Sequence, residues 1–359
     1  MILKEVVSYG ETSYKFLWLY DPLSYGGYGI ANLQQCKHLI RQGVDVSLHP
    51  KFNPLPGSTE WNVLTKEEKK MFEKKFKVRR IGVVQTTMFS FNLNRSKIKI
   101  GMTMAESDRI RGEWVDTCNK MDHIVVPNEF YKKVFRKSGV KPPITIIPHG
   151  VDTERYKYYD RPKRKTFAFG TCGFLNERKG IFELIQAFIS EFSKEENVRL
   201  RLHSTDPNLG YYKNFSDKRI EIGIEHWDFP TLVKFYHDLD CFVFPSRAEG
   251  IGYPPREAMA TGLPTIVMNY SGLEDIAQTD YVYPISPDGF EIKAIVEQQR
   301  GSWAKIDIKE LMYWMRYVYE HQKEAKKKGE RAAGFIRTNY QWKDSTKKLI
   351  RLLRKYDNS

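Results

Sequence analysis

Short apolar runs alternate with amphipathic stretches along the first 150 residues. The apolar runs are rich in aromatic and β-branched residues and are bounded by polar, glycine or proline positions, which is typical of buried strands. The stretches between them place apolar residues at helical spacing. Predicted strands cover residues 14–20, 44–48, 80–85, 98–104, 123–127 and 144–148, and predicted helices cover residues 30–41, 108–119 and 128–138. This alternation predicts a parallel sheet with helices on both faces.

The same alternation begins again after a charged segment at residues 155–165. Predicted strands cover residues 166–171, 198–203, 220–224, 241–244, 265–268 and 281–285, and predicted helices cover residues 181–192 and 231–239. Helical spacing dominates from residue 307, and the last helix, at 343–355, is amphipathic and basic. We therefore expect two doubly wound α/β domains, residues 1–150 and 151–340. A final segment, 341–359, is expected to pack back on the first domain.

The composition fits a soluble protein with two such domains. The chain has 359 residues, of which 41% are hydrophobic and 28% charged. No apolar window is long enough to span a bilayer and the first residues show no apolar signal segment, so we expect a cytoplasmic protein. The four cysteines, Cys36, Cys118, Cys172 and Cys241, lie far apart, which favours reduced buried thiols over disulfides or a zinc site.

The net charge of +14 is high for an enzyme of this size. Lysine and arginine gather at residues 66–80, 161–165, 323–331 and 347–355. Each cluster alone is consistent with a solvated helix face. Together they indicate a polyanionic partner, either nucleic acid or an anionic membrane surface.

Residues 245–260 carry the clearest chemical pattern. They follow a predicted buried strand, 241–244, and two carboxylates, Glu249 and Glu257, bracket a loop rich in glycine and proline. Three strong helix formers follow Glu257, so we expect this residue in the first turn of a helix. A strand end, a glycine loop and a helix N-terminus form a favoured phosphate site. The alternative is that Glu257 only starts the helix and that Glu249 is a surface charge.

A second glycine-rich segment, residues 170–180, also leads from a strand into a helix. Its Arg178 and Lys179 would place two cations at a helix N-terminus, where the helix dipole disfavours them unless an anion binds there. The segment lacks the residue order of a P-loop and of a dinucleotide fingerprint. It predicts a phosphate site of another kind, or else a charged surface turn.

These residues resemble a known family. Residues 245–264 read Pro-Ser-x-x-Glu-Gly-x-Gly-x-Pro-x-x-Glu-Ala-Met-Ala-x-Gly-x-Pro, which resembles the donor-site signature of retaining glycosyltransferases of family 4. Residues 178–180 look like the family's diphosphate-binding turn, 148–152 like its interdomain segment, and Gly26-Gly27 like its N-terminal glycine loop. The resemblance spans most of the chain. It implies a GT-B fold, in which two Rossmann-like domains face each other across a cleft.

The resemblance also implies roles for the paired charges. Glu249 would hold hydroxyls of the donor sugar, and Glu257 would bind the ribose hydroxyls of the nucleotide. Arg178 and Lys179 would neutralise the diphosphate as it departs, so that no metal is required. The first domain would bind the acceptor and the second the nucleotide sugar.

Neutral groups would complete the donor site. Backbone amides of the glycine loop would bind phosphate oxygens, from Gly250, Ile251, Gly252 and Tyr253. Loops near Gly173 and at residues 225–228 would recognise the base. Trp227 either stacks on that base or is a packed indole.

The sequence departs from the family on the first domain. Many members have a histidine where this chain has Ala105-Glu106-Ser107-Asp108-Arg109. Glu106 or Asp108 would then bind donor or acceptor, although Asp108 is also a plausible cap for the following helix. His149, in the interdomain segment, is expected to be a structural imidazole.

The expected function is sugar transfer from a nucleoside-diphosphate sugar, with UDP as the expected nucleotide, to an acceptor hydroxyl with retention of configuration. The basic clusters favour a hydroxylated base in DNA as acceptor, with an extruded base entering the cleft. The alternative acceptor is lipid-linked or a polysaccharide at an anionic membrane, with the last helix docking the enzyme. A third possibility is a non-catalytic nucleic-acid-binding module. No bound cofactor and no obligate protein partner are expected.

Overall fold

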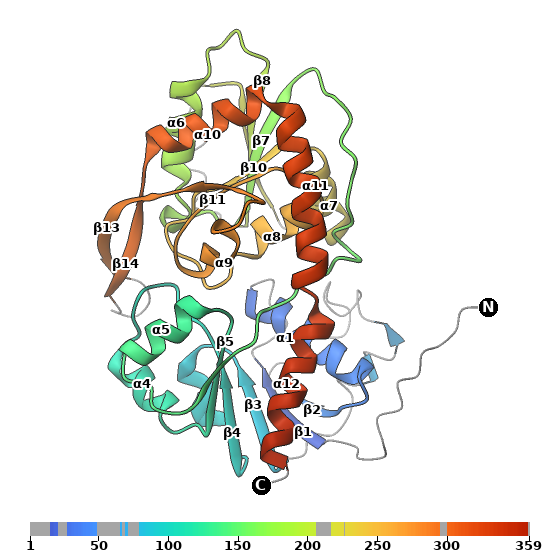
Figure 1. The fold of residues 1–359 in the computed structure, drawn as a ribbon, viewed down its shortest axis with the longest axis vertical. Coiled ribbons are helices and arrows are strands. Elements are labelled where there is room, and N and C mark those ends of the chain that lie inside the picture. The colour runs from blue at the N-terminus through green and yellow to red at the C-terminus, as the bar shows by residue number, and fades with distance from the viewer. Residues whose placement is uncertain are drawn as a thin grey trace, which may run out of the picture.

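The computed structural model describes residues 15–20, 27–48, 65–66, 69–70, 79–205, 217–225, 227–294 and 300–357. Figure 1 shows two α/β domains, one above the other, each with a sheet flanked by helices. The last two helices run from the upper, C-terminal domain down along the lower, N-terminal one. The expected class, two doubly wound α/β domains, is confirmed.

The N-terminal domain is built on one parallel sheet of six strands. In spatial order the strands are β2 (Asp45–Leu48), β1 (Lys15–Tyr20), β3 (Ile81–Gln85), β4 (Ile98–Met102), β5 (His123–Val126) and β6 (Ile144–Ile146). Its helices are α1 (Gly27–Arg41), the 3-10 helix η2 (Met88–Leu93), α4 (Gly112–Cys118) and α5 (Glu129–Lys137). Burial of all residues of β3 and β5 explains why both read as continuous apolar runs.

The C-terminal domain repeats this plan. Its parallel strands lie in the order β12 (Tyr283–Ile285), β11 (Thr265–Met268), β10 (Cys241–Phe244), β7 (Phe167–Gly173), β8 (Val198–Ser204) and β9 (Ile220–Ile224). Its helical segments are η3 (Glu177–Lys179), α6 (Ile181–Glu191), α7 (Phe229–His237), α8 (Tyr253–Ala260), η5 (Ser271–Leu273), α9 (Glu274–Ala277), α10 (Ile308–Glu320) and α11 (Gln322–Asn339). The strand order reverses at β10 and β7, which are hydrogen-bonded neighbours.

The last helix, α12 (Trp342–Asp357), belongs to the N-terminal domain by its contacts. Its apolar residues Leu349 and Leu353 are buried in one cluster with Cys36 and Leu39 of α1. The apolar face with which this amphipathic helix was expected to dock on a membrane is therefore already covered by the N-terminal domain. No helix in the described part of the chain is long and apolar enough to cross a bilayer.

A two-stranded hairpin was not expected from the sequence. Strands β13 (Pro287–Ala294) and β14 (Arg300–Ile306) pair antiparallel and project from the C-terminal domain toward the N-terminal one (Figure 1). At β14 the backbone amide and hydroxyl of Ser302 donate to the Asp108 carboxylate, at 2.9 and 2.8 Å. Helix α4 begins only at Gly112, with Arg111 as its N-cap, so the predicted capping role of Asp108 is wrong.

All four cysteines are buried and free, as expected. Burial raises the pKa of the Cys118 and Cys172 thiols to about 12, which keeps both protonated at neutral pH. Within the residues that the structure describes, no cluster of three His, Cys, Asp or Glu side chains is placed to hold a metal ion.

Candidate active site

The candidate site lies where the strand order of the C-terminal sheet reverses. The chain leaves β7 toward β8 and leaves β10 toward β11, on opposite sides of the β7–β10 pair. The loops that follow the two strands therefore diverge and leave a crevice at the carboxyl edge of the sheet. These loops contain residues 174–180 and 245–252, the two segments singled out from the sequence.

Left-handed backbone at three glycines shapes the two loops. Gly180 (φ 66°) caps the start of α6, Gly252 (φ 71°) caps the start of α8, and Gly173 has φ 132°. Residues with a Cβ rarely adopt such angles. Gly250 is also needed for close approach, since a Cβ there would lie 2.6 Å from Met104 Sδ of the N-terminal domain.

Glu249 is the centre of the site. Its side chain is buried, and one carboxylate oxygen accepts hydrogen bonds from Lys179 Nζ, from Arg178 at 3.2 Å and from Ser246 Oγ at 2.5 Å. Burial alone would raise the pKa of Glu249, but the two adjacent cations outweigh it and hold the pKa below its usual value. The carboxylate therefore stays ionised at neutral pH.

The backbone of Glu249 is fixed from two directions. Ser271 Oγ accepts from its amide at 2.8 Å, and the Tyr131 hydroxyl of α5 donates to its carbonyl. Tyr131 belongs to the N-terminal domain, so the partner domain helps to hold the central carboxylate in place.

The two cations are held differently. Lys179 is buried, with Nζ 5.0 Å from the centre of the Phe244 ring. Burial lowers its pKa, and the attraction of Glu249 opposes that effect. Arg178 donates to the Ala248 carbonyl and reaches Glu106 across the domain boundary at 3.1 Å. The structure thus brings together all four residues predicted for catalysis: Glu249, Lys179, Arg178 and Glu106.

Glu257 lies deeper in its helix than predicted. Helix α8 begins at Tyr253, with prolines in its first turn, so Glu257 is in the second turn and not the first. Proline is tolerated there because first-turn amides have no partner within the helix. The Tyr236 hydroxyl donates to the Glu257 carboxylate at 2.8 Å, and burial raises the pKa of that carboxyl. Glu257 also lines a small pocket at the domain boundary with Gln34, Asp152 and Arg155.

Arg256 locks the shape of the glycine loop. Its buried guanidinium donates to the carbonyls of Ile251, Gly252 and Gly272 and to the Asp275 carboxylate. Among the described residues, none accepts a hydrogen bond from the amides of Ile251 and Gly252. The amides of this fixed loop can therefore donate hydrogen bonds to a phosphate oxygen.

The glycine loop meets the start of α1 across the cleft. Ile251 and Tyr253 share a small apolar cluster with Ala31 of α1, and a Cβ on Gly27 would lie 3.4 Å from the Tyr253 ring. Gly26 lies outside the described residues. The Tyr253 hydroxyl is 2.6 Å from His149 Nδ1, and burial lowers the pKa of His149 to about 3. His149 is thus a neutral, structural imidazole.

Trp227 is packed on a neighbouring side chain. Its indole stacks on the His203 ring, with the two planes 6° apart, and donates to Glu225 at 2.7 Å. One ring face is therefore covered, which fits the packed alternative. Base stacking on the other face stays a prediction.

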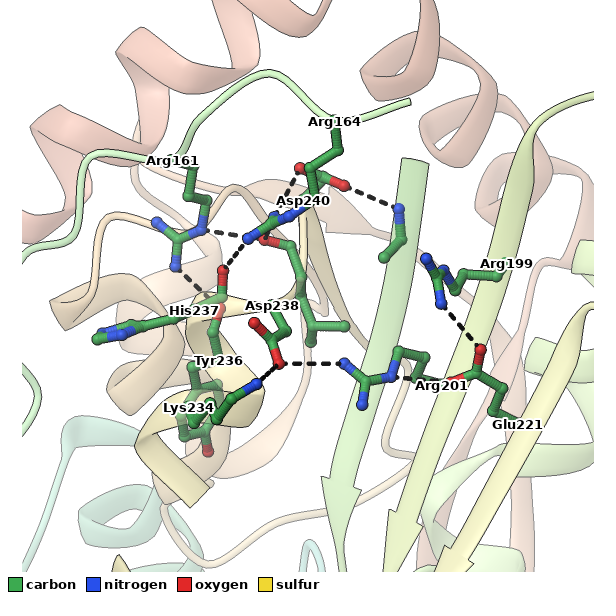
Figure 2. Close-up of polar contacts among 12 residues, drawn as sticks. Arg161, Arg164, Arg199, Arg201, Glu221, Lys234, Tyr236, His237, Asp238 and Asp240 are labelled. Carbon is green, nitrogen blue, oxygen red and sulfur yellow. Dashed lines mark hydrogen bonds and ion pairs between the residues drawn. The ribbon is translucent and has the colours of Figure 1, made fainter. Parts of the chain in front are cut away.

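Part of the positive charge is used inside the fold. Figure 2 shows Arg161 and Arg164 beside the end of α7, where His237 and Asp240 lie. Arg161 donates to the carbonyls of Tyr236 and Thr261, at 3.1 and 2.9 Å, and Arg164 donates to the His237 carbonyl at 2.7 Å. These carbonyls close α7 and α8, where the helix dipole attracts cations. Arg161 and Arg164 of the cluster at 161–165 therefore bind helix ends, while Lys163 and Lys165 are exposed.

Other arginines on this side are paired as well. Arg199 and Arg201 both bind Glu221, at 3.0 and 3.1 Å, and Lys234 binds Asp238 at 2.6 Å (Figure 2). The cluster at 66–80 lies mostly outside the described residues.

Sequence reasoning missed several parts of the site. Tyr131, Ser271 and the hairpin carry no motif, and they reach Glu249 or Asp108 only through tertiary contacts. Ser246 stands inside the motif, directly after the strand, and its position could have identified it.

The comparisons with known proteins bear on the family and the fold of the chain. Residues 166–296, within the C-terminal domain, match the family model described as "Glycosyl transferases group 1". The chain is 24% identical over 204 residues to the lipopolysaccharide core biosynthesis mannosyltransferase LpsB of Rhizobium meliloti, covering 52% of this chain and 56% of LpsB. It is 31% identical over 147 residues to the capsular polysaccharide biosynthesis glycosyltransferase CapM of Staphylococcus aureus, covering 39% and 37%. The matches thus span about half or less of these relatives.

Solved structures support the fold over nearly the whole chain. A sucrose-phosphate synthase from Thermosynechococcus elongatus superposes with a TM-score of 0.73 at 14% identity, covering 96% of this chain and all of that one. A glycosyltransferase from Rickettsia africae superposes with a TM-score of 0.68 at 13% identity, covering 96% and 98%. These neighbours confirm the predicted GT-B fold.

Proposed function

We propose that this protein is a glycosyltransferase that moves a sugar from a nucleoside-diphosphate sugar to a hydroxyl acceptor. The observation that carries the proposal is the buried Glu249, flanked by Lys179 and Arg178 at the point where the strand order reverses. The two cations can bind an anionic diphosphate, and the carboxylate beside them can accept hydrogen bonds from the hydroxyls of an attached sugar.

The reaction transfers the anomeric carbon from one oxygen to another. The bond from that carbon to the diphosphate oxygen breaks, and its electron pair stays on the diphosphate. The acceptor oxygen forms the new bond, and its proton passes to a phosphate oxygen of the leaving group. Lys179, Arg178 and the amides of the glycine loop stabilise the charge that develops there.

The carboxylates orient the rest of the donor. In this proposal Glu249 accepts hydrogen bonds from hydroxyls of the sugar, and Glu257 accepts hydrogen bonds from the ribose hydroxyls of the nucleotide. The nucleotide that we propose first is UDP. Glu106 faces the acceptor side. Our proposals of family 4 and of retention rest on the resemblance of residues 245–264. Retention requires the acceptor to approach the sugar from the face that the diphosphate leaves.

For the acceptor we propose a glycan hydroxyl. Two relatives, LpsB and CapM, are named for lipopolysaccharide core biosynthesis and capsular polysaccharide biosynthesis. Part of the charge that favoured DNA is used in the fold, since Arg161 and Arg164 bind helix ends. The acceptor would enter from the N-terminal domain.

DNA is the second candidate acceptor, and the net charge of +14 favours it. Binding to duplex DNA would then fall steeply as salt is raised. Failure to bind duplex DNA at low salt removes this candidate and leaves the glycan proposal intact.

A thermal-shift screen against UDP, GDP and ADP tests the donor site. A nucleotide that binds only the folded protein raises its melting temperature. We expect at least one of the three to do so, and Lys179→Ala to abolish the shift. Absence of any shift in the wild type at millimolar nucleotide would contradict the proposed function.

A further inference from the structure

Arg178 is shared by carboxylates from both domains. One of its nitrogens lies 3.2 Å from Glu249 in the C-terminal domain, and another lies 3.1 Å from Glu106 in the N-terminal domain. Glu106 follows the end of β4, directly across the cleft from η3. Both terminal nitrogens of the guanidinium are thus paired with carboxylates before any donor is present.

The local charges balance without a ligand. Two cations, Arg178 and Lys179, face two carboxylates, Glu249 and Glu106, and Lys179 also binds Glu249. A diphosphate brings at least two further negative charges into this group. Because like charges repel strongly in a partly buried site, one carboxylate must give up its cation when the diphosphate arrives.

Glu106 is the carboxylate that is able to leave. The Glu249 side chain is only 6% exposed and is also bonded to Ser246, whereas the Glu106 side chain is 42% exposed and can turn into solvent. The domains do not depend on Glu106 to stay in contact. Asp108 binds Ser302 across the same boundary, and Tyr131 binds the Glu249 backbone.

We propose that the Glu106 carboxylate competes with the donor's diphosphate for Arg178, so that donor binding displaces Glu106 from the cation. The inference rests on the proposed donor site. It assigns Glu106 as a positioning residue: it holds Arg178 toward the cleft in the empty enzyme and sets the affinity for the diphosphate.

Isothermal titration of the full chain with UDP, GDP and ADP tests this competition. Glu106→Gln and Glu106→Ala remove the competing charge, so both should bind the tightest of the three nucleotides about fivefold more tightly than the wild type, as expected for loss of a partly exposed ion pair. The gain should shrink as sodium chloride is raised, because salt screens the pair that the wild type must break.

Glu113→Gln is the matched control. Glu113 is an exposed residue of α4 that pairs with Arg111, so its substitution removes the same charge from the same domain without touching Arg178. Its affinity for the nucleotide should equal that of the wild type. Equal tightening in Glu113→Gln would mean that net charge alone is responsible, and would overturn the inference.

The remaining outcomes separate the inference from the proposed function. If the wild type binds a nucleotide and the Glu106 variants bind it equally or more weakly, the competition does not exist and the donor site stands. If neither the wild type nor any variant binds UDP, GDP or ADP, the donor site itself is contradicted and the inference falls with it.

Discussion

The two sides of the cleft differ in how they are built. On the C-terminal side two short segments supply the charged groups: 178–179 carries Arg178 and Lys179, and 245–257 carries Glu249 and Glu257. On the N-terminal side the groups that reach the site come from separate elements: Glu106 from the loop after β4 and Tyr131 from α5. Groups that stand close together within a short segment leave a pattern in the sequence, and groups brought together only by domain packing do not.

The two sides also differ in rigidity. Glu249 and Arg256 are buried and hydrogen-bonded to several partners, and Lys179 is buried against Glu249. The Glu106 side chain is 42% exposed and pairs with Arg178. Rigid, buried groups suit a role that is the same for every turnover, such as holding a diphosphate. An exposed group suits a role that changes as substrates enter and leave. Substitutions on the two sides should therefore differ in their effects on turnover, stability and nucleotide affinity.

The largest effect is expected from Glu249→Gln. The neutral amide cannot balance Lys179 or accept sugar hydroxyls as strongly, so sugar transfer should slow by about 100-fold. Rates of nucleoside diphosphate release from the donor measure this, with Glu195→Gln, an exposed residue after α6, as control. A rate close to that of the wild type would remove Glu249 from the mechanism.

Gly272→Ala tests how tightly the donor side is packed. A Cβ there would lie 2.6 Å from the Glu249 carbonyl oxygen, against backbone that cannot move away. We expect the free energy of unfolding to fall by about 2 kcal/mol, measured by urea denaturation. Gly334→Ala in α11 is the control, because a Cβ there meets nothing within 4 Å and alanine favours the helix. Equal stability of both variants would argue against a rigid donor side.

Asp108→Ala tests the contact between the two sides. It removes both hydrogen bonds to Ser302 and loosens the domain boundary, so donor turnover should slow by about fivefold. Nucleotide affinity, measured by titration, should stay near that of the wild type because Asp108 does not contact Arg178. A loss of nucleotide affinity as large as that of turnover would place Asp108 in the donor site instead.

The pH dependence of stability should report the buried His149 at the domain boundary. Its pKa is about 3 in the folded protein and near 6.5 when unfolded, so the unfolded state binds more protons between these values. Stability is therefore lost as pH falls through this window, by about 1 kcal/mol from this residue between pH 7 and pH 5.5.

Urea denaturation at the two pH values measures this effect. The difference between them should be smaller in His149→Gln than in the wild type. His321→Gln, at an exposed position, should behave like the wild type. An unchanged difference in His149→Gln would mean that the histidine is not buried as a neutral group.

The smallest effect is expected from removal of divalent metal. Because Arg178 and Lys179 are placed to take the charge of the leaving diphosphate, we expect transfer in excess EDTA to proceed at the same rate. Loss of activity that returns with Mg²⁺ or Mn²⁺ would show that the cations do not suffice.

Much of the fold was predictable, because the spacing of apolar residues and the residue types both favour strands in the core of each sheet. Residues 241–244 and 265–268 were predicted with the bounds observed for β10 and β11. The errors have local causes. Pro254 and Pro255 read as loop residues, yet they form the first turn of α8. In the hairpin, strand β13 has Phe290 and Ile292 more than half exposed, so this strand lacks a clear buried face.

The candidate site was predictable to the extent that it is local. The spacing of Glu249 and Glu257 and the adjacent pair Arg178-Lys179 stand in the sequence, and the structure places Glu249 within reach of both cations. The contact between Glu106 and Arg178 joins residues from two domains. No local pattern encodes that distance, since it depends on how the domains close.

The most direct test of sugar transfer at this site is nucleoside diphosphate release. Wild type and Lys179→Ala are incubated with UDP-, GDP- and ADP-sugars, with and without oligosaccharide acceptors, and the freed nucleoside diphosphate is measured. We expect the wild type to release it from at least one donor and Lys179→Ala to be more than about tenfold slower while still folded. Release at the same rate by both proteins, or no release from any donor, would contradict the account.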